Sequence, residues 1–142
     1  PGRLVQLAAP EDLYRHPADL AATRFFSEIN ELPGRVAGGR VVTPIGVLDA
    51  TLPADVGDGS AVVVALRPHD VRPVPATDGR GTVLSRRFLG EVDHLEIAIE
   101  GIDAPLIVRD ARPGRLAAGQ RVTLTVAPGA ALVFGTGRQA AE

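Results

Sequence analysis

The sequence predicts a mainly β chain: a small antiparallel barrel or sandwich that is preceded by two short helices. Two observations predict it. Glycine-containing turns are followed by short valine runs at four places, and no long helical pattern separates them. Strands that follow one another through turns, without long intervening helices, favour a small antiparallel architecture. A chain of 142 residues is also long enough to bury a core without disulfides.

The two predicted helices lie within the first 30 residues. Residues 9–16 combine a proline near the start, two acids in the first turn and basic residues at the end, an order that suits the helix dipole. Pro17 interrupts this helix and begins a second one, which is predicted to run through Phe26. The apolar residues that would form the packing face are Leu13, Leu20, Phe25 and Phe26.

The predicted strands follow after Asn30. Four of them begin just after a glycine: Gly39, Gly59, Gly81 and Gly119. Residues 61–66 are apolar throughout, which predicts a strand covered on both faces. Residues 92–100 alternate instead, so one face is apolar and the other polar: Leu95, Ile97 and Ile99 against His94, Glu96 and Glu100.

The composition excludes several classes of protein. Without cysteine there is no disulfide framework, no thiolate nucleophile and no cysteine-ligated zinc site. The net charge of −2 gives no bulk attraction to a polyanion, and no apolar run approaches the roughly 20 residues of a membrane span. The chain begins with Pro1 and contains no methionine, so we expect it to be a processed chain or a piece of a larger one.

No common catalytic motif is present, so we expect no catalytic residue, cofactor or metal ligand in this chain. There is no Gly-x-Ser-x-Gly elbow, and a Walker A loop cannot exist because the chain has no lysine. The three histidines, His16, His69 and His94, are far apart in sequence and read more simply as exposed polar residues than as metal ligands. Nucleic-acid binding is not expected either, because a basic groove with aromatic platforms is missing.

Five segments, taken in order, resemble the ATP-binding subunits of bacterial ABC importers. They are Val5–Ala18 (containing Pro-Glu-Asp-Leu-Tyr-Arg-His-Pro), Phe25–Asn30 (Phe-Phe-Ser-Glu-Ile-Asn), Ala65–Val71 (Ala-Leu-Arg-Pro-His-Asp-Val), Phe88–Glu91 (Phe-Leu-Gly-Glu) and Gly119–Leu124. The first two look like the end of the nucleotide-binding domain, with Ser27 in place of the usual glycine. The other three look like the appended TOBE (transport-associated oligonucleotide-binding-like) domain.

This resemblance implies a domain division and a function. Residues 1–30 would be the helical tail of a nucleotide-binding domain, 31–136 an OB-like β-barrel and 137–142 a disordered tail. The barrel would regulate the subunit and hold two copies together, while ATP and Mg²⁺ would bind in the parent protein. The implied partners are a second copy, the parent nucleotide-binding domain and the membrane permease subunits. The implied location is cytoplasmic, at the inner membrane but not inserted into it.

The resemblance also suggests a group of importers. Residues 28–34 and 39–46 look more like the ferric-iron, polyamine, sulfate and phosphonate group than the sugar importers. Ferric iron is the first expectation within that group.

Seven residues are candidates for structural or interface roles: Arg67, Pro68, Asp70, Phe88, Leu89, Gly90 and Glu91. Proline ends a strand because it cannot donate to a further ladder, and Arg67 could pin the turn by pairing with Asp70 or Glu91. Phe88 and Leu89 would most simply anchor a strand in the core before the bend at Gly90, and their alternative role is a contact between subunits.

A second hypothesis is a barrel that senses a small anion or a metal ion. Arg67, Arg86 and Arg87 could contact an anion, and His94 with Glu96 could form a metal feedback site.

Overall fold

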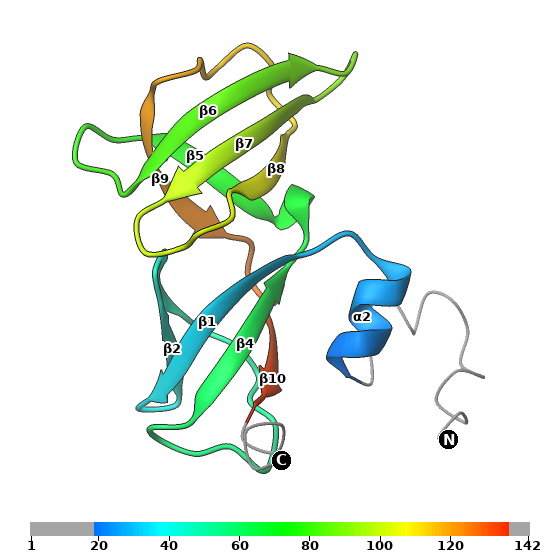
Figure 1. Cartoon of the computed structure of the whole chain (residues 1–142), viewed down its shortest axis with the longest axis vertical. Coiled ribbons are helices and arrows are strands. Elements are labelled where there is room, and N and C mark those ends of the chain that lie inside the picture. Colours follow the sequence, from blue (N-terminus) through cyan, green and yellow to red (C-terminus); the bar gives the residue numbers. More distant parts are fainter. Residues whose placement is uncertain (1–18, 137–142) are drawn as a thin grey trace.

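The computed structural model describes residues 19–136, which form two five-stranded antiparallel sheets with little helix (Figure 1). The mainly β class is therefore confirmed. Within these residues one short α-helix, α2 (Leu20–Phe26), precedes the strands, so the expectation of two helices is not borne out. The other predicted helix, at 9–16, lies outside the described residues. Helix α2 begins after Asp19 rather than at Pro17, because the Asp19 carboxylate caps it by accepting from the Ala22 N–H at 2.8 Å.

The first sheet, sheet A, has the strand order β10-β4-β1-β2-β3. Its strands are β1 (Asn30–Ala37), β2 (Arg40–Thr43), β3 (Gly46–Leu48), β4 (Ala61–Leu66) and β10 (Leu132–Gly135). The β1–β2 hairpin closes through Gly38 and Gly39, whose φ angles are 61° and 79°. Two consecutive residues in the left-handed region are what a tight two-residue hairpin turn requires, and glycine adopts that region without steric cost.

The second sheet, sheet B, has the order β5-β9-β6-β7-β8. Its strands are β5 (Val71–Pro75), β6 (Gly81–Phe88), β7 (Asp93–Ile99), β8 (Leu106–Asp110) and β9 (Arg121–Val126). The sheet curls until its edge strands β5 and β8 come into contact. Arg115 bridges that seam, because its Nη2 donates to the Pro73 carbonyl of β5 at 2.7 Å and to Asp110 Oδ2 of β8 at 3.3 Å.

Strand β6 contains one β-bulge. Val83 pairs with Ile97 and Ser85 with Glu96, so Leu84 is an extra residue without a partner on β7. Beyond the bulge Arg86 faces Leu95, on the same side of the sheet as the core.

Both sheets contribute to a single hydrophobic core that contains residues of every strand except β3. The alternation predicted for 92–100 is confirmed, because Leu95, Ile97 and Ile99 are buried, whereas His94 and Glu96 are half-buried and Glu100 is exposed. Strand β4 matches its prediction only in its second half, where Val64, Ala65 and Leu66 are all fully buried.

The two sheets are joined through a 3₁₀ turn, η2 (Pro68–Asp70), between β4 and β5. This turn packs against β8, so the joint and one edge of sheet B lie together in the middle of the molecule (Figure 1).

Candidate interaction surface

The predicted site residues lie in three separate places. Arg67, Pro68 and Asp70 are at the joint between the sheets, and Phe88–Glu91 include the last residue of β6 and most of its connection to β7. His94 and Glu96 lie along β7. The β6–β7 connection is at the far end of sheet B from η2 (Figure 1), so the structure does not bring the first two groups together.

The joint residues have structural contacts. Arg67 and Pro68 are buried, and proline occupies the first position of η2, where its fixed φ suits the turn. The Asp70 N–H donates to the Arg67 carbonyl at 3.0 Å, and the Ala127 N–H donates to the Asp70 carbonyl at 2.9 Å. These bonds fix the crossing from one sheet to the other.

A second link between the sheets passes through Asn30, at the start of β1. The Asn30 side chain accepts from the Ile107 N–H at 2.7 Å and donates through Nδ2 to the Ile107 carbonyl at 2.9 Å. Nδ2 also lies 3.3 Å from the Leu66 carbonyl of β4. The motif at 25–30 includes Asn30, but no sequence pattern indicates a partner 77 positions away.

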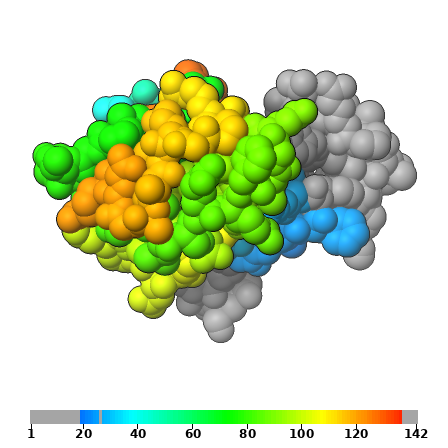
Figure 2. Space-filling view, turned by 90° about the horizontal axis from the view of Figure 1, so that it is seen from above, coloured from blue at the N-terminus to red at the C-terminus, as the bar shows by residue number. Residues whose placement is uncertain are grey.

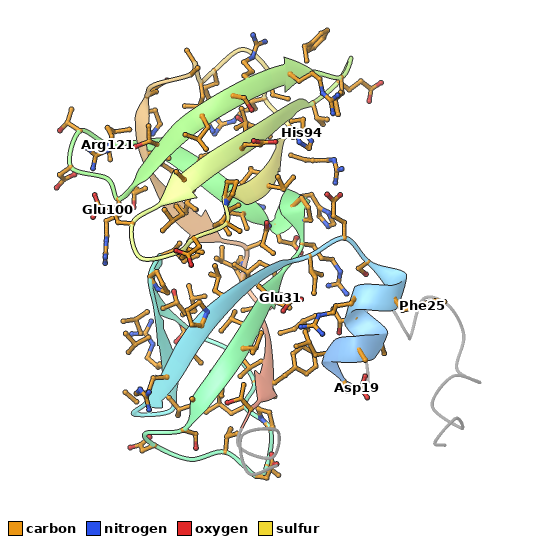
Figure 3. The ribbon with its side chains drawn as sticks, in the orientation of Figure 1. Asp19, Phe25, Glu31, His94, Glu100 and Arg121 are labelled. Carbon is orange, nitrogen blue, oxygen red and sulfur yellow. The ribbon has the colours of Figure 1, made fainter. Side chains whose placement is uncertain are left out.

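Two ion pairs flank Asn30. Arg109 Nη2 of β8 lies 2.7 Å from Glu28 Oε1, in the connector between α2 and β1. Arg24 of α2 donates to both carboxylate oxygens of Glu31, at 2.6 and 2.7 Å. The hydrogen bonds to Arg24 lower the pKa of the Glu31 carboxyl, and the same bonds raise the pKa of Arg24. Figure 3 shows Glu31 beside α2.

The connection between β6 and β7 is a hydrogen-bonded turn with an apolar surface. Phe88 and Leu89 are 57% and 47% exposed, and the Leu89 N–H donates to the Val92 carbonyl at 2.9 Å. Gly90 has a φ of 105°, which its lack of a Cβ permits. In the space-filling view the light-green atoms of this connection project from the surface (Figure 2). We call Phe88, Leu89, Gly90 and Glu91 the tip.

The prediction that Phe88 anchors a strand in the core is wrong. Phe88 pairs with Asp93 at the last position of β6, five residues past Val83, the last buried residue of that strand. Its ring is therefore left largely in solvent, although it shares a face with core residues.

The base of the tip is held by Asp93, which is only 1% exposed. Its Oδ2 accepts from Arg86 Nε at 2.6 Å and from the Gly114 N–H at 2.7 Å. The hydrogen bond from Arg86 lowers the pKa of the Asp93 carboxyl, and the Gly114 N–H acts in the same direction. The alternation over 92–100 already places Asp93 on the same face as Leu95, so a buried carboxylate could have been predicted there.

The three arginines proposed for an anion do not share a site. Arg67 is buried at the joint, Arg86 is bound to Asp93, and Arg87 faces outward opposite His94. His94 and Glu96 share the outer face of β7, where Figure 3 labels His94. Within residues 19–136, no group of three or more histidine, aspartate or glutamate side chains is placed to hold a metal ion.

Two hollows lie between the β2–β3 hairpin and β9. The larger has a volume of about 390 Å³ and the smaller about 120 Å³, and Ile45 and Leu124 line both. Neither is lined by a predicted site residue.

The pattern of the TOBE domain matches residues 64–134, which is half of the chain and includes η2, the tip and all of sheet B. The chain belongs to the TOBE domain family. A Streptomyces coelicolor Fe(3+) ions import ATP-binding protein is 35% identical over 73% of this chain and 29% of its own length. A Bradyrhizobium diazoefficiens sulfate/thiosulfate import ATP-binding protein is 35% identical over 87% of this chain and 36% of its own length. A Ruegeria pomeroyi spermidine/putrescine import ATP-binding protein is 30% identical over 87% of this chain and 36% of its own length.

These relatives confirm the resemblance to the TOBE domain of ABC importer ATP-binding subunits. This TOBE chain spans about a third of the length of the curated relatives it matches, and their names differ in the imported substrate. Among the described residues, no helix is both long and apolar enough to cross a membrane.

Proposed function

We propose that this TOBE chain is the regulatory and dimerising part of the ATP-binding subunit of a bacterial ABC importer. The observation that supports dimerisation is the tip, where Phe88 and Leu89 expose large apolar side chains on a hydrogen-bonded turn. Adjacent exposed apolar side chains on a folded domain mark an interaction site more often than scattered ones do, and aromatic residues contribute heavily to binding energy.

The tip is suited to pairing with a second copy because its shape is fixed before binding. The Arg86–Asp93 pair and the Gly114 N–H hold the end of the hairpin, so little conformational entropy remains to be lost on association. A surface that meets its own copy across a two-fold axis also needs only one patch per chain.

Sedimentation velocity tests this proposal. We expect the wild-type chain to dimerise and the double variant Phe88→Asp/Leu89→Asp to sediment as a monomer, because the charges would be buried on association. Val42→Asp is the matched control. Val42 lies on the other sheet, and its exposed fraction of 47% equals that of Leu89. A wild-type chain that stays monomeric at high micromolar concentration contradicts self-association.

The remaining parts of the proposal concern the whole subunit. Residues 1–30 would belong to the tail of a nucleotide-binding domain, 31–136 to the regulatory domain and 137–142 to a terminal tail. The nucleotide-binding domain would bind ATP and Mg²⁺ and contact the permease subunits on the cytoplasmic side of the inner membrane. ATP hydrolysis by the purified chain alone would contradict this division.

Ferric iron is our first choice of imported substrate. The resemblance at residues 28–34 and 39–46 and the Streptomyces coelicolor relative support it. Uptake assays with ferric iron, sulfate and spermidine, in cells that depend on the full subunit, would test this choice.

The alternative, a sensor for a small anion or a metal ion, has less support because Arg67 is buried at the joint, Arg86 is bound to Asp93 and Arg87 lies on the opposite face of β6. Calorimetric titration with molybdate, sulfate, phosphate and ferric citrate tests it directly, and binding of any of them would restore it.

A further inference from the structure

We infer that residues 24–31 act as a mechanical coupler that makes α2, sheet A and sheet B move as one body. We call the contacts of Arg24, Glu28, Asn30 and Glu31 the clamp. The inference does not depend on self-association, because every contact of the clamp lies within one chain.

The central contact of the clamp imitates a strand. An asparagine side chain offers one acceptor and two donor hydrogens, so it can satisfy the N–H and the C=O of one residue as a neighbouring strand would. Ile107 lies in β8, which is an edge strand of sheet B. Asn30 itself lies in β1 of sheet A, so its side chain adds one rung to sheet B and ties the two sheets together.

Burial makes this contact hard to exchange for water. Asn30 is only 6% exposed, and its amide also reaches the carbonyl of Leu66 in β4. A buried polar group that loses its partner bears the full desolvation penalty, so the clamp resists opening more than an exposed contact would.

The ion pairs extend the coupling from β1 to the helix. Glu28 ties the connector to Arg109 of β8, and Arg24 ties α2 to Glu31 of β1 through two parallel hydrogen bonds. The connector itself has only three residues, 27–29, which span about 10 Å when extended. A connector this short, fixed at both ends and in its middle, leaves α2 little freedom to turn.

The consequence for a subunit rests on the proposed function. If α2 is the last helix of a nucleotide-binding domain, a displacement of that helix is transmitted to β8. The β6–β7 hairpin lies next to β8 in sheet B, so the tip would follow the helix.

Pulsed electron paramagnetic resonance on the whole chain tests the coupling. The chain has no cysteine, so Ala21→Cys and Ala117→Cys would give two unique label sites, both exposed, on α2 and in the turn before β9. We expect a single narrow distance in the otherwise unchanged chain. We expect that narrow peak to be lost in Asn30→Ala and in the double variant Glu28→Gln/Arg109→Gln.

Asp49→Asn is the matched control. The Arg40–Asp49 pair is about as short as the Arg109–Glu28 pair, at 2.6 Å against 2.7 Å, but it lies on the β2–β3 side of sheet A and crosses no joint. Its removal should leave the distance peak narrow.

The double variant keeps the test decisive if Asn30→Ala does not fold, because Glu28 and Arg109 are partly exposed and lie outside the hydrophobic core. A lower melting temperature with an unchanged narrow peak would show that the clamp only stabilises the fold, and it would overturn the inference.

Discussion

The two hairpins β1–β2 and β6–β7 are built on different physical principles. The first closes through Gly38 and Gly39, whose positive φ angles form a tight turn, and its one side-chain contact is an exposed hydrogen bond from the Gly38 N–H to Asp58 Oδ1 at 3.0 Å. The second has a longer turn, an extra residue at Leu84 and a buried ionic contact at Asp93. Both hairpins supply core residues, Val36 and Val41 in the first and Leu95 in the second, but the turn of the second also holds Phe88 and Leu89 out in solvent. The hydrogen bonds to the buried Asp93 lie directly below this apolar tip, which indicates that the position of the tip is structurally supported.

We expect the largest loss of stability from a substitution in the core of the second hairpin and a much smaller loss from one at its tip. Leu95→Ala removes a fully buried side chain and should lower the free energy of unfolding by about 2–5 kcal/mol. Phe88→Ala should lower it by no more than about 0.5 kcal/mol, because the ring is mostly exposed. Urea denaturation at a concentration where the chain is monomeric measures both. Equal losses would place Phe88 in the core after all.

We expect the next largest loss of stability from a substitution in the turn of the first hairpin. Gly39→Val puts a β-branched residue at a φ of 79° and should cost about 1–2 kcal/mol. No atom lies within 4 Å of a Cβ built at Gly39, so conformational strain would be the only cause. Gly57→Val is a fitting comparison, because Gly57 also has open space around it and its φ is not positive. Similar losses at both positions in thermal denaturation would contradict the backbone explanation.

A smaller effect should appear in the pH dependence of stability. Arg86 lowers the pKa of Asp93 in the folded chain, so the pair stabilises the fold above the unfolded value of about 3.9. That contribution is lost as the pH falls through the lower, folded pKa. The Asp93→Asn variant should therefore be less stable than the wild type at pH 7, and the difference should shrink below about pH 4.

Melting temperatures between pH 3 and pH 7 measure the Asp93 contribution. Glu31→Gln is the control, since Arg24 lowers the pKa of Glu31 in the same way but the pair is far more exposed. Salt should weaken the Glu31 contribution more than that of Asp93. A pH-independent difference between Asp93→Asn and the wild type would contradict the ionic role of this carboxylate.

The sequence patterns predicted the strands well because burial on a pleated strand follows a period of two, as residues 92–100 demonstrate. They failed at Phe88 because periodicity does not reveal where the core ends along a strand. They could not identify the partner of Asn30 either, since Ile107 is brought beside it only by the packing of one sheet on the other. Local patterns therefore predicted β2, β4, β6, β7 and β9 but indicated no strand at β1, β3, β5 or β8, and the tip and the clamp depend on tertiary structure.

The bulge at Leu84 sets the register in which the second hairpin ends. If β6 gave up the bulge and slid by one position along β7, the residue opposite Asp93 would be Arg87 and no longer Phe88. Because two arginines stand side by side, a guanidinium would remain within reach of that carboxylate in either register. Sliding would also move Phe88 one step further into the turn, so the bulge determines which residue ends β6 beside the buried Asp93.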